Sequence, residues 1–263
     1  MTNSENLRDI VCDLLLEIER EQTPSHVAIR RMLEKYQYLS AGERRFISRL
    51  TRGTLERQIT LDWMIERFSS VKIKKMKPVI RTILRMSVYQ IKYMDGVPES
   101  AVCNEAVKLA KKRGFKNLSG FVNGILRNMI RNPEKLEVPK DNLSVCYSQP
   151  QWLADYWEQC YGRENTVKMF EWFLKEQPLT VRLSRKGLTP EMFQKRMEAQ
   201  GVEAVQNPLI SEAFSLKGFD YLGALPEFRE GLCTVQDVSS MLVAKAAGVK
   251  PADKVIDVCA APG

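Results

Sequence analysis

The C-terminal residues have the composition of a cofactor-binding turn. An apolar run, Lys254–Val258, reads as a buried parallel strand. In a doubly wound sheet, small residues after such a strand let the backbone approach a nucleotide-type cofactor, and the next helix offers free N–H groups. The run lacks the Gly-x-Gly-x-x-Gly pattern and also fits an ordinary strand and turn. The candidate cofactor-binding residues are Cys259, Ala260, Ala261, Pro262 and Gly263.

Metal and hydrolase chemistry lack their usual residues. The chain has one histidine, His26, and six cysteines without a Cys-x-x-Cys pair. A structural zinc site takes four Cys or His ligands, so we expect no metal. A Ser-His-Asp or Cys-His hydrolase would have to use His26, which follows Pro24 at an expected helix start and is interpreted as a surface residue.

Charge is distributed unevenly along the chain. Residues 1–140 contain 27 Lys and Arg against 16 Asp and Glu, a balance of +11. Residues 141–263 contain 13 against 16, a balance of −3. This asymmetry indicates that the first part contacts a polyanion, and the alternative is a solvated helical surface.

Two cation clusters are candidates for phosphate contacts, because phosphate binding requires no particular sequence. The first cluster precedes Pro78 in one loop and consists of Lys72, Lys74, Lys75 and Lys77. The second lies at an expected helix C-terminus and consists of Lys111, Lys112, Arg113 and Lys116. Cations in that position also complement the helix dipole, which gives the second cluster a structural alternative.

Two other groups of residues are interpreted as structural. Trp152, Trp157 and Trp172 have helical spacing and apolar neighbours, so we expect core positions rather than platforms for nucleic-acid bases. Gly120 and Gly124, four residues apart, are expected to permit close helix packing.

The elements that must position these residues predict a multidomain chain. Residues 1–135 contain successive apolar stripes of helical period, which predict an all-α bundle. Residues 133–145 are polar with two prolines and predict a linker. Residues 145–234 mix helical patterns with short strands and predict a small α+β domain. Residues 235–263 predict a helix over 238–247 and the start of a Rossmann-like α/β domain.

The expected strands of the middle domain are Leu179–Leu183, Ala213–Leu216 and Leu232–Val235. No run of about 18 apolar residues is present to span a membrane. The N-terminus has acidic residues among its apolar positions, unlike a signal peptide. We expect a cytoplasmic protein.

Two motifs resemble RNA cytosine-C5 methyltransferases. Asp257–Gly263 is similar to the motif D-x-C-A-A-P-G-G-K-T of that family, as far as its first glycine, and Val235–Ser240 is similar to its Q-D-x-S segment. Residues 1–135 independently resemble the NusB-type RNA-binding domain. That resemblance is carried by Gly53–Leu55, Leu61–Trp63, Leu84–Gln90, Val97–Ala101, Asn104–Val107 and Phe121–Arg127.

Tyr147–Leu153 resembles the opening of the domain that joins these two parts. The order is that of the RsmB (Sun/Fmu) family of small-subunit rRNA methyltransferases, and the resemblance covers essentially the whole chain. It implies an S-adenosylmethionine-dependent 16S rRNA cytosine-C5 methyltransferase that acts as a monomer on ribosomal RNA, without metal or membrane. One departure is Arg182-Leu183-Ser184, where the family usually has R-x-N.

The resemblance also implies that the catalytic cysteines lie in motifs beyond Gly263, so we expect no catalytic residue here. Cys259 would line the cofactor turn. The chain is expected to be truncated within the cofactor motif and inactive alone. The alternative is a non-enzymatic NusB-type RNA-binding module in antitermination or ribosome assembly, which explains residues 1–135 equally well but not residues 145–263.

Overall fold

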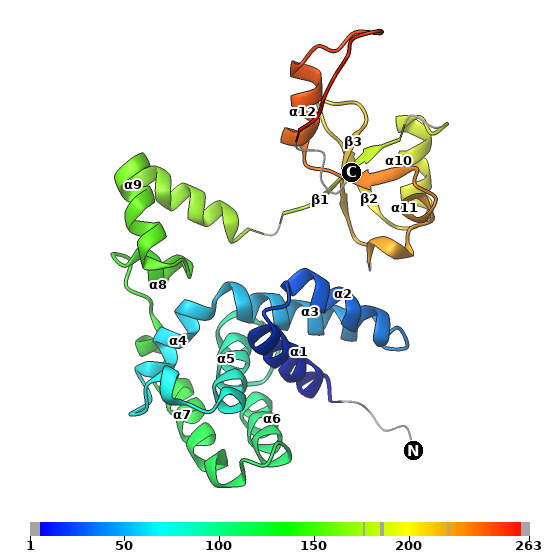
Figure 1. Cartoon of the computed structure of the whole chain (residues 1–263). Coiled ribbons are helices and arrows are strands. Elements are labelled where there is room, and N and C mark those ends of the chain that lie inside the picture. The colour runs from blue at the N-terminus through cyan, green and yellow to red at the C-terminus, as the bar shows by residue number, and fades with distance from the viewer. Residues whose placement is uncertain (1–5, 176, 185–186, 220, 259–263) are drawn as a thin grey trace. The chain divides into compact units, whose positions relative to one another are not determined.

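The structure is a computed structural model that describes residues 6–175, 177–184, 187–219 and 221–258 (Figure 1). It divides into two compact units, Met1–Lys175 and Glu176–Gly263. The expected domain boundaries, at residues 1–135, 145–234 and 235–263, stay a prediction.

The first unit begins with a helical bundle, as predicted. Its central helix is α5 (Pro78–Tyr93), whose residues 82–90 are all buried and which contacts α1, α3, α4, α6 and α7. Pro78 occupies the first turn of α5, where its missing N–H costs nothing. The other helices of the bundle are α1 (Leu7–Glu21), α2 (Ser25–Lys35), α3 (Ala41–Glu56), α4 (Gln58–Glu66), η1 (Ile73–Lys75), α6 (Glu99–Lys112), η2 (Lys116–Leu118) and α7 (Ser119–Arg131).

Helix α3 is fixed at its start and along its buried face. Ser40 and Glu43 form the capping box that their spacing predicts, with the Ser40 N–H donating to Glu43 at 2.9 Å. Gly53 faces α5 so closely that a Cβ at this position would lie 1.9 Å from Cζ of Tyr89. Only glycine allows this helix spacing.

The predicted linker, residues 133–145, is partly structured and packed. It contains η3 (Pro133–Leu136) and leads into α8 (Leu143–Tyr147), with Leu136 and Leu143 buried. The hydroxyl of Thr60 donates to the Val145 carbonyl at 2.6 Å, which ties α8 to α4. Pro133 begins η3, and the apolar residues Leu136 and Val138, between the two prolines, anchor the segment to the bundle.

Helix α9 (Gln151–Phe173) corrects one expectation. It breaks at Gly162, whose φ of 74° is non-helical, so its two halves run in different directions (Figure 1). Trp157 stacks on Phe170 with ring centroids 5.4 Å apart. Trp152 and Trp172 are 69% and 57% exposed, so their predicted core positions are wrong. Of the three tryptophans, Trp157 packs against the small buried cluster of Leu143, Ala154 and Phe170.

The second unit is an antiparallel sheet covered by short helices. The strands occur in the order β2-β3-β1-β4. The core includes Val181, Phe193 and Phe214. The strands are β1 (Leu179–Leu183), β2 (Glu203–Gln206), β3 (Ala213–Lys217) and β4 (Cys233–Val235), and the helices are α10 (Pro190–Ala199), η4 (Leu222–Ala224), α11 (Pro226–Arg229) and α12 (Val238–Ala246).

The sequence predicts β1, β3, β4 and α12, which the structure confirms, but it misses β2. Lys254–Val258 does not form the expected buried parallel strand. The structure has no strand at these residues, and Ile256 is 88% exposed. A strand needs neighbours to bond its N–H and C=O groups, and the described sheet, which is antiparallel, does not include this segment. The turn Cys259–Gly263 lies outside the described residues.

Candidate nucleic-acid interface

The first cation cluster lies on a loop held by its apolar residues. Ile73 and Met76 are buried, and the Ile73 N–H donates to the Glu66 carboxylate at 3.0 Å. With those two side chains directed inward, the lysines between and beside them face solvent. Lys72, Lys74, Lys75 and Lys77 are exposed, and none has an ion-pair partner among the described residues.

The second cluster is divided between free and paired cations. Lys112 lies 2.5 Å from the Asp9 carboxylate, and Arg113 Nε donates to the same carboxylate at 2.8 Å. Arg113 also pairs with Asp13. These contacts join the end of α6 to α1. Lys111 and Lys116 are exposed and unpaired within the described part of the chain.

The pKa directions agree with a structural role for this pairing. Burial raises the pKa of the Asp9 carboxyl, but hydrogen bonds and charge from Lys112 and Arg113 outweigh burial and leave that pKa below its ordinary value. The hydrogen bond to Asp13 contributes most to the raised pKa of Arg113. Lys112 and Arg113 thus already have anionic partners, and Lys111 and Lys116 do not.

A third cation group was missed by the sequence reasoning. Arg45, Arg49 and Arg52 lie on the exposed face of α3, opposite the buried Ile47 and Leu50. The available signal was the spacing i, i+4, i+7 in a helix whose other face is apolar.

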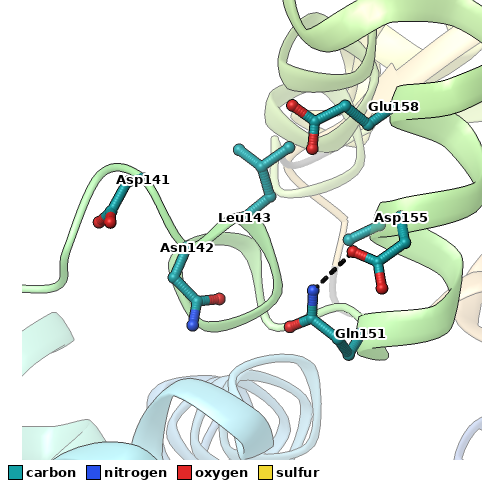
Figure 2. A pocket seen from close by; sticks show the side chains of 7 residues that line it. Asp141, Asn142, Leu143, Gln151, Asp155 and Glu158 are labelled. Carbon is teal, nitrogen blue, oxygen red and sulfur yellow. Dashed lines mark hydrogen bonds between the residues drawn. The ribbon is translucent and has the colours of Figure 1, made fainter.

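Two hollows lined by described residues of the first unit have acidic linings. One, of about 270 Å³, is lined by residues of α8 and α9 and of the loop before α8. The Gln151 side-chain amide donates a hydrogen bond of 2.8 Å to the Asp155 carboxylate in its lining, and Figure 2 shows this pair. The carboxylates of this hollow are Asp141, Asp155 and Glu158. The other, of about 350 Å³, includes Glu99, Glu134 and Glu137 with Lys92. Carboxylates repel phosphate, so the exposed cations are the better candidates for an anionic partner.

The described residues do not fit an S-adenosylmethionine site. A doubly wound sheet binds its cofactor at the carboxyl ends of adjacent parallel strands, and the sheet described here is antiparallel. Among the described residues, no cluster of three or more His, Cys, Asp and Glu is arranged to hold a metal ion. No helix in the described ranges is both long and apolar enough to cross a bilayer.

The fold and its exposed cations define a class of protein: a basic helical bundle followed by a small antiparallel α+β unit. Residues 5–131 match the NusB family. Residues 149–219 match the Methyltr_RsmF/B-like, ferredoxin-like domain. A NusB-type module alone does not explain the second match, which disfavours the non-enzymatic alternative.

Curated relatives match nearly the whole chain. Probable ribosomal RNA small subunit methyltransferase B of Bacillus subtilis is 34% identical over 98% of this chain, and its namesake from Synechocystis sp. is 34% identical over 97%. Ribosomal RNA small subunit methyltransferase B of Serratia proteamaculans is 27% identical over 100%. The chain is thus similar over nearly its whole length to proteins named ribosomal RNA small subunit methyltransferase B. It spans 58% of the length of the first two relatives.

A solved structure supports the same architecture. The crystal structure of PH0851 matches with a TM-score of 0.69 and 19% identity, covering 94% of this chain and 57% of that one. This similarity shows that the order of a helical unit and a small sheet unit is shared.

Proposed function

We propose that this chain serves in S-adenosylmethionine-dependent, cytosine-C5 methylation of small-subunit rRNA in the cytoplasm, and that its first unit recognises the RNA. The observation that carries the proposal is 34% identity to a probable rRNA small subunit methyltransferase B over 98% of the chain. The chain spans 58% of that relative. The activity is therefore proposed for a protein that contains this chain.

RNA recognition by the first unit is supported by its family and its charge. Residues 5–131 match the NusB family. Residues 1–140 carry a balance of +11. The candidate contacts with ribosomal phosphates are the exposed, unpaired cations Lys72, Lys74, Lys75, Lys77, Lys111 and Lys116.

Three of the described cysteines are poor nucleophiles. This agrees with the expectation that the catalytic cysteines lie in motifs beyond Gly263. Burial raises the pKa of the Cys12 thiol to about 12 and that of Cys233 to about 11. Burial also raises the pKa of Cys103. The thiolate is the reactive form, so these thiols stay protonated at neutral pH.

Salt-dependent RNA binding tests the proposal. We expect the chain to bind a small-subunit rRNA fragment in filter assays, with a slope of log K against log salt of about −0.7 per phosphate contact. Four contacts would weaken binding about fiftyfold between about 50 and 200 mM salt. A flat salt response, or no binding, would contradict the proposal.

Charge-removing variants locate the contact. K72Q/K74Q/K75Q/K77Q should reduce the steepness of the slope. The control is K195Q/K217Q/R229Q, which removes exposed cations from the second unit and should leave the slope nearly unchanged. Equal effects of both variants would show that net charge alone, rather than this loop, sets the affinity.

A further inference from the structure

Helix α3 presents a row of three arginines to solvent. Arg45, Arg49 and Arg52 occupy positions i, i+4 and i+7, and all three are exposed. Side chains at these spacings are neighbours on one helix face. At about 1.5 Å of rise per residue, the row is about 10 Å long.

None of the three has a carboxylate partner within the described part of the chain. Other arginines of the same unit do: Arg30 pairs with Glu34 on α2, and Arg85 is held at 2.6 Å by Asp62. Like charges at helical spacing destabilise a helix. Repulsion among the three arginines therefore lowers the stability of the helix. Within the described residues, no ion pair with a carboxylate offsets that repulsion.

Arg49, the middle residue of the row, is bonded to α5. Arg49 Nη2 donates to the Tyr93 carbonyl at 3.0 Å, at the C-terminus of α5. The guanidinium of Arg57 lies 5.1 Å from the centre of the Tyr93 ring. Arg49 has five N–H donors, so this bond fixes its position while leaving donors free for a ligand.

The platform beneath the row is rigid. Ile47 and Leu50 are fully buried, and Gly53 brings α3 against Tyr89. A helix packed in this way keeps its exposed face in one orientation. Little backbone conformational entropy is then lost when the arginines meet a ligand.

We propose that the Arg45–Arg49–Arg52 face of α3 binds the phosphate backbone of RNA. This inference rests on the proposed function and names a surface for it. That surface is separate in sequence from the first cation cluster, Lys72, Lys74, Lys75 and Lys77. Phosphate is the favoured ligand because planar guanidinium groups bind its oxygens through paired N–H donors. Successive guanidinium groups along one helix face suit a ligand with regularly repeated anions.

The test is the salt dependence of the full chain binding to an in vitro transcribed small-subunit rRNA hairpin. R45Q/R49Q/R52Q should make the slope of log K against log salt shallower by about 2, because three phosphate contacts at about 0.7 each are lost. The affinity ratio between native chain and variant should then shrink about 20-fold between about 50 and 200 mM salt. Gln has a helix propensity near that of Arg, so the circular dichroism spectrum should match that of the native chain. The midpoint of thermal unfolding should be no lower than that of the native chain, because the variant lacks the repulsion between the three arginines.

Two further variants complete the comparison. R45K/R49K/R52K keeps the charge and should retain most of the slope. K195Q/K217Q/R229Q removes three exposed cations of the second unit and should change it little. If the native chain binds RNA and the α3 variant has an unchanged slope, this inference is overturned while the proposed function stands.

The remaining outcomes are also decisive. If the native chain binds no RNA, both the proposed function and this inference fail. Poly-L-glutamate serves as a probe for an acidic protein partner. If it binds as tightly as the hairpin and loses binding with the α3 variant, the surface recognises an acidic protein and the RNA assignment is wrong.

Discussion

Nε of Arg182 donates a hydrogen bond of 2.5 Å to Oε1 of Gln236, across 54 residues of sequence. Arg182 lies on β1 opposite Thr234 of β4, and the Gln236 N–H bonds the Thr180 carbonyl at 3.2 Å. The next residue, Asp237, accepts from the Ser239 N–H at 2.8 Å and caps α12. The Gln-Asp pair therefore joins the sheet to the following helix.

This contact predicts energetic coupling between the two side chains. R182A and Q236A should each destabilise the β1–β4 pairing by about 0.5–1.5 kcal/mol, and the double variant should lose less than their sum. Hydrogen exchange of the β1 and β4 amides would measure it. K195A, which removes an exposed cation on α10, should show no coupling with Q236A. Full additivity of R182A and Q236A would contradict the contact.

Two glycines in the bundle should respond oppositely to alanine. G53A places a Cβ 1.9 Å from Tyr89 Cζ and should destabilise the first unit by about 1–3 kcal/mol. Gly124 is exposed, with nothing within 4 Å of a built Cβ, so G124A should stabilise α7 by about 0.5–1 kcal/mol. Urea unfolding monitored by tryptophan fluorescence would check both. A stabilising G53A would refute the close helix approach.

Gly124 also shows where sequence reasoning stops. The pair Gly120 and Gly124 was expected at a close helix contact, yet both are exposed and meet nothing within 4 Å. Spacing places residues on one helix face but does not say whether another helix lies against that face. The exposure of Trp152 and Trp172 has the same explanation.

The helices of the bundle were predictable because their signals are local. The capping box at Ser40 and the proline at the start of α5 act within one turn. Strand β2 gave no such signal, since Ala204 alone of its residues is buried. The pairing of Arg113 with Asp9 joins residues 104 apart in sequence, so only the tertiary structure separates Lys112 and Arg113 from the free lysines.

The Asp9 contacts predict a loss of stability in acid. The pKa of Asp9 is lowered in the folded state, so its stabilisation is fully present above the unfolded value of 3.8 and is lost as the pH falls through the folded pKa. D9N should lower stability at neutral pH by about 1–2 kcal/mol and remove this part of the acid dependence.

Urea unfolding at a series of pH values between about 6 and 3 would test this expectation. D13N is the matched control: the Asp13 side chain is 66% exposed, so solvent screening should make its effect smaller. If the native chain and D9N give parallel stability curves throughout that range, Asp9 is not responsible for the acid dependence.

A polypeptide of residues 1–263 should neither methylate rRNA nor bind S-adenosylmethionine with a Kd below about 1 mM. Such a site needs the carboxyl ends of several parallel strands, and the described residues supply only an antiparallel sheet, with Ile256 and Val258 of the predicted strand exposed. Calorimetry with S-adenosylmethionine and transfer of a labelled methyl group to small-subunit rRNA would measure both. A protein of the length of the relatives that includes this chain should be active in the same assay. Transfer by residues 1–263 alone would show that the nucleophile lies within this chain, against what the family resemblance implies.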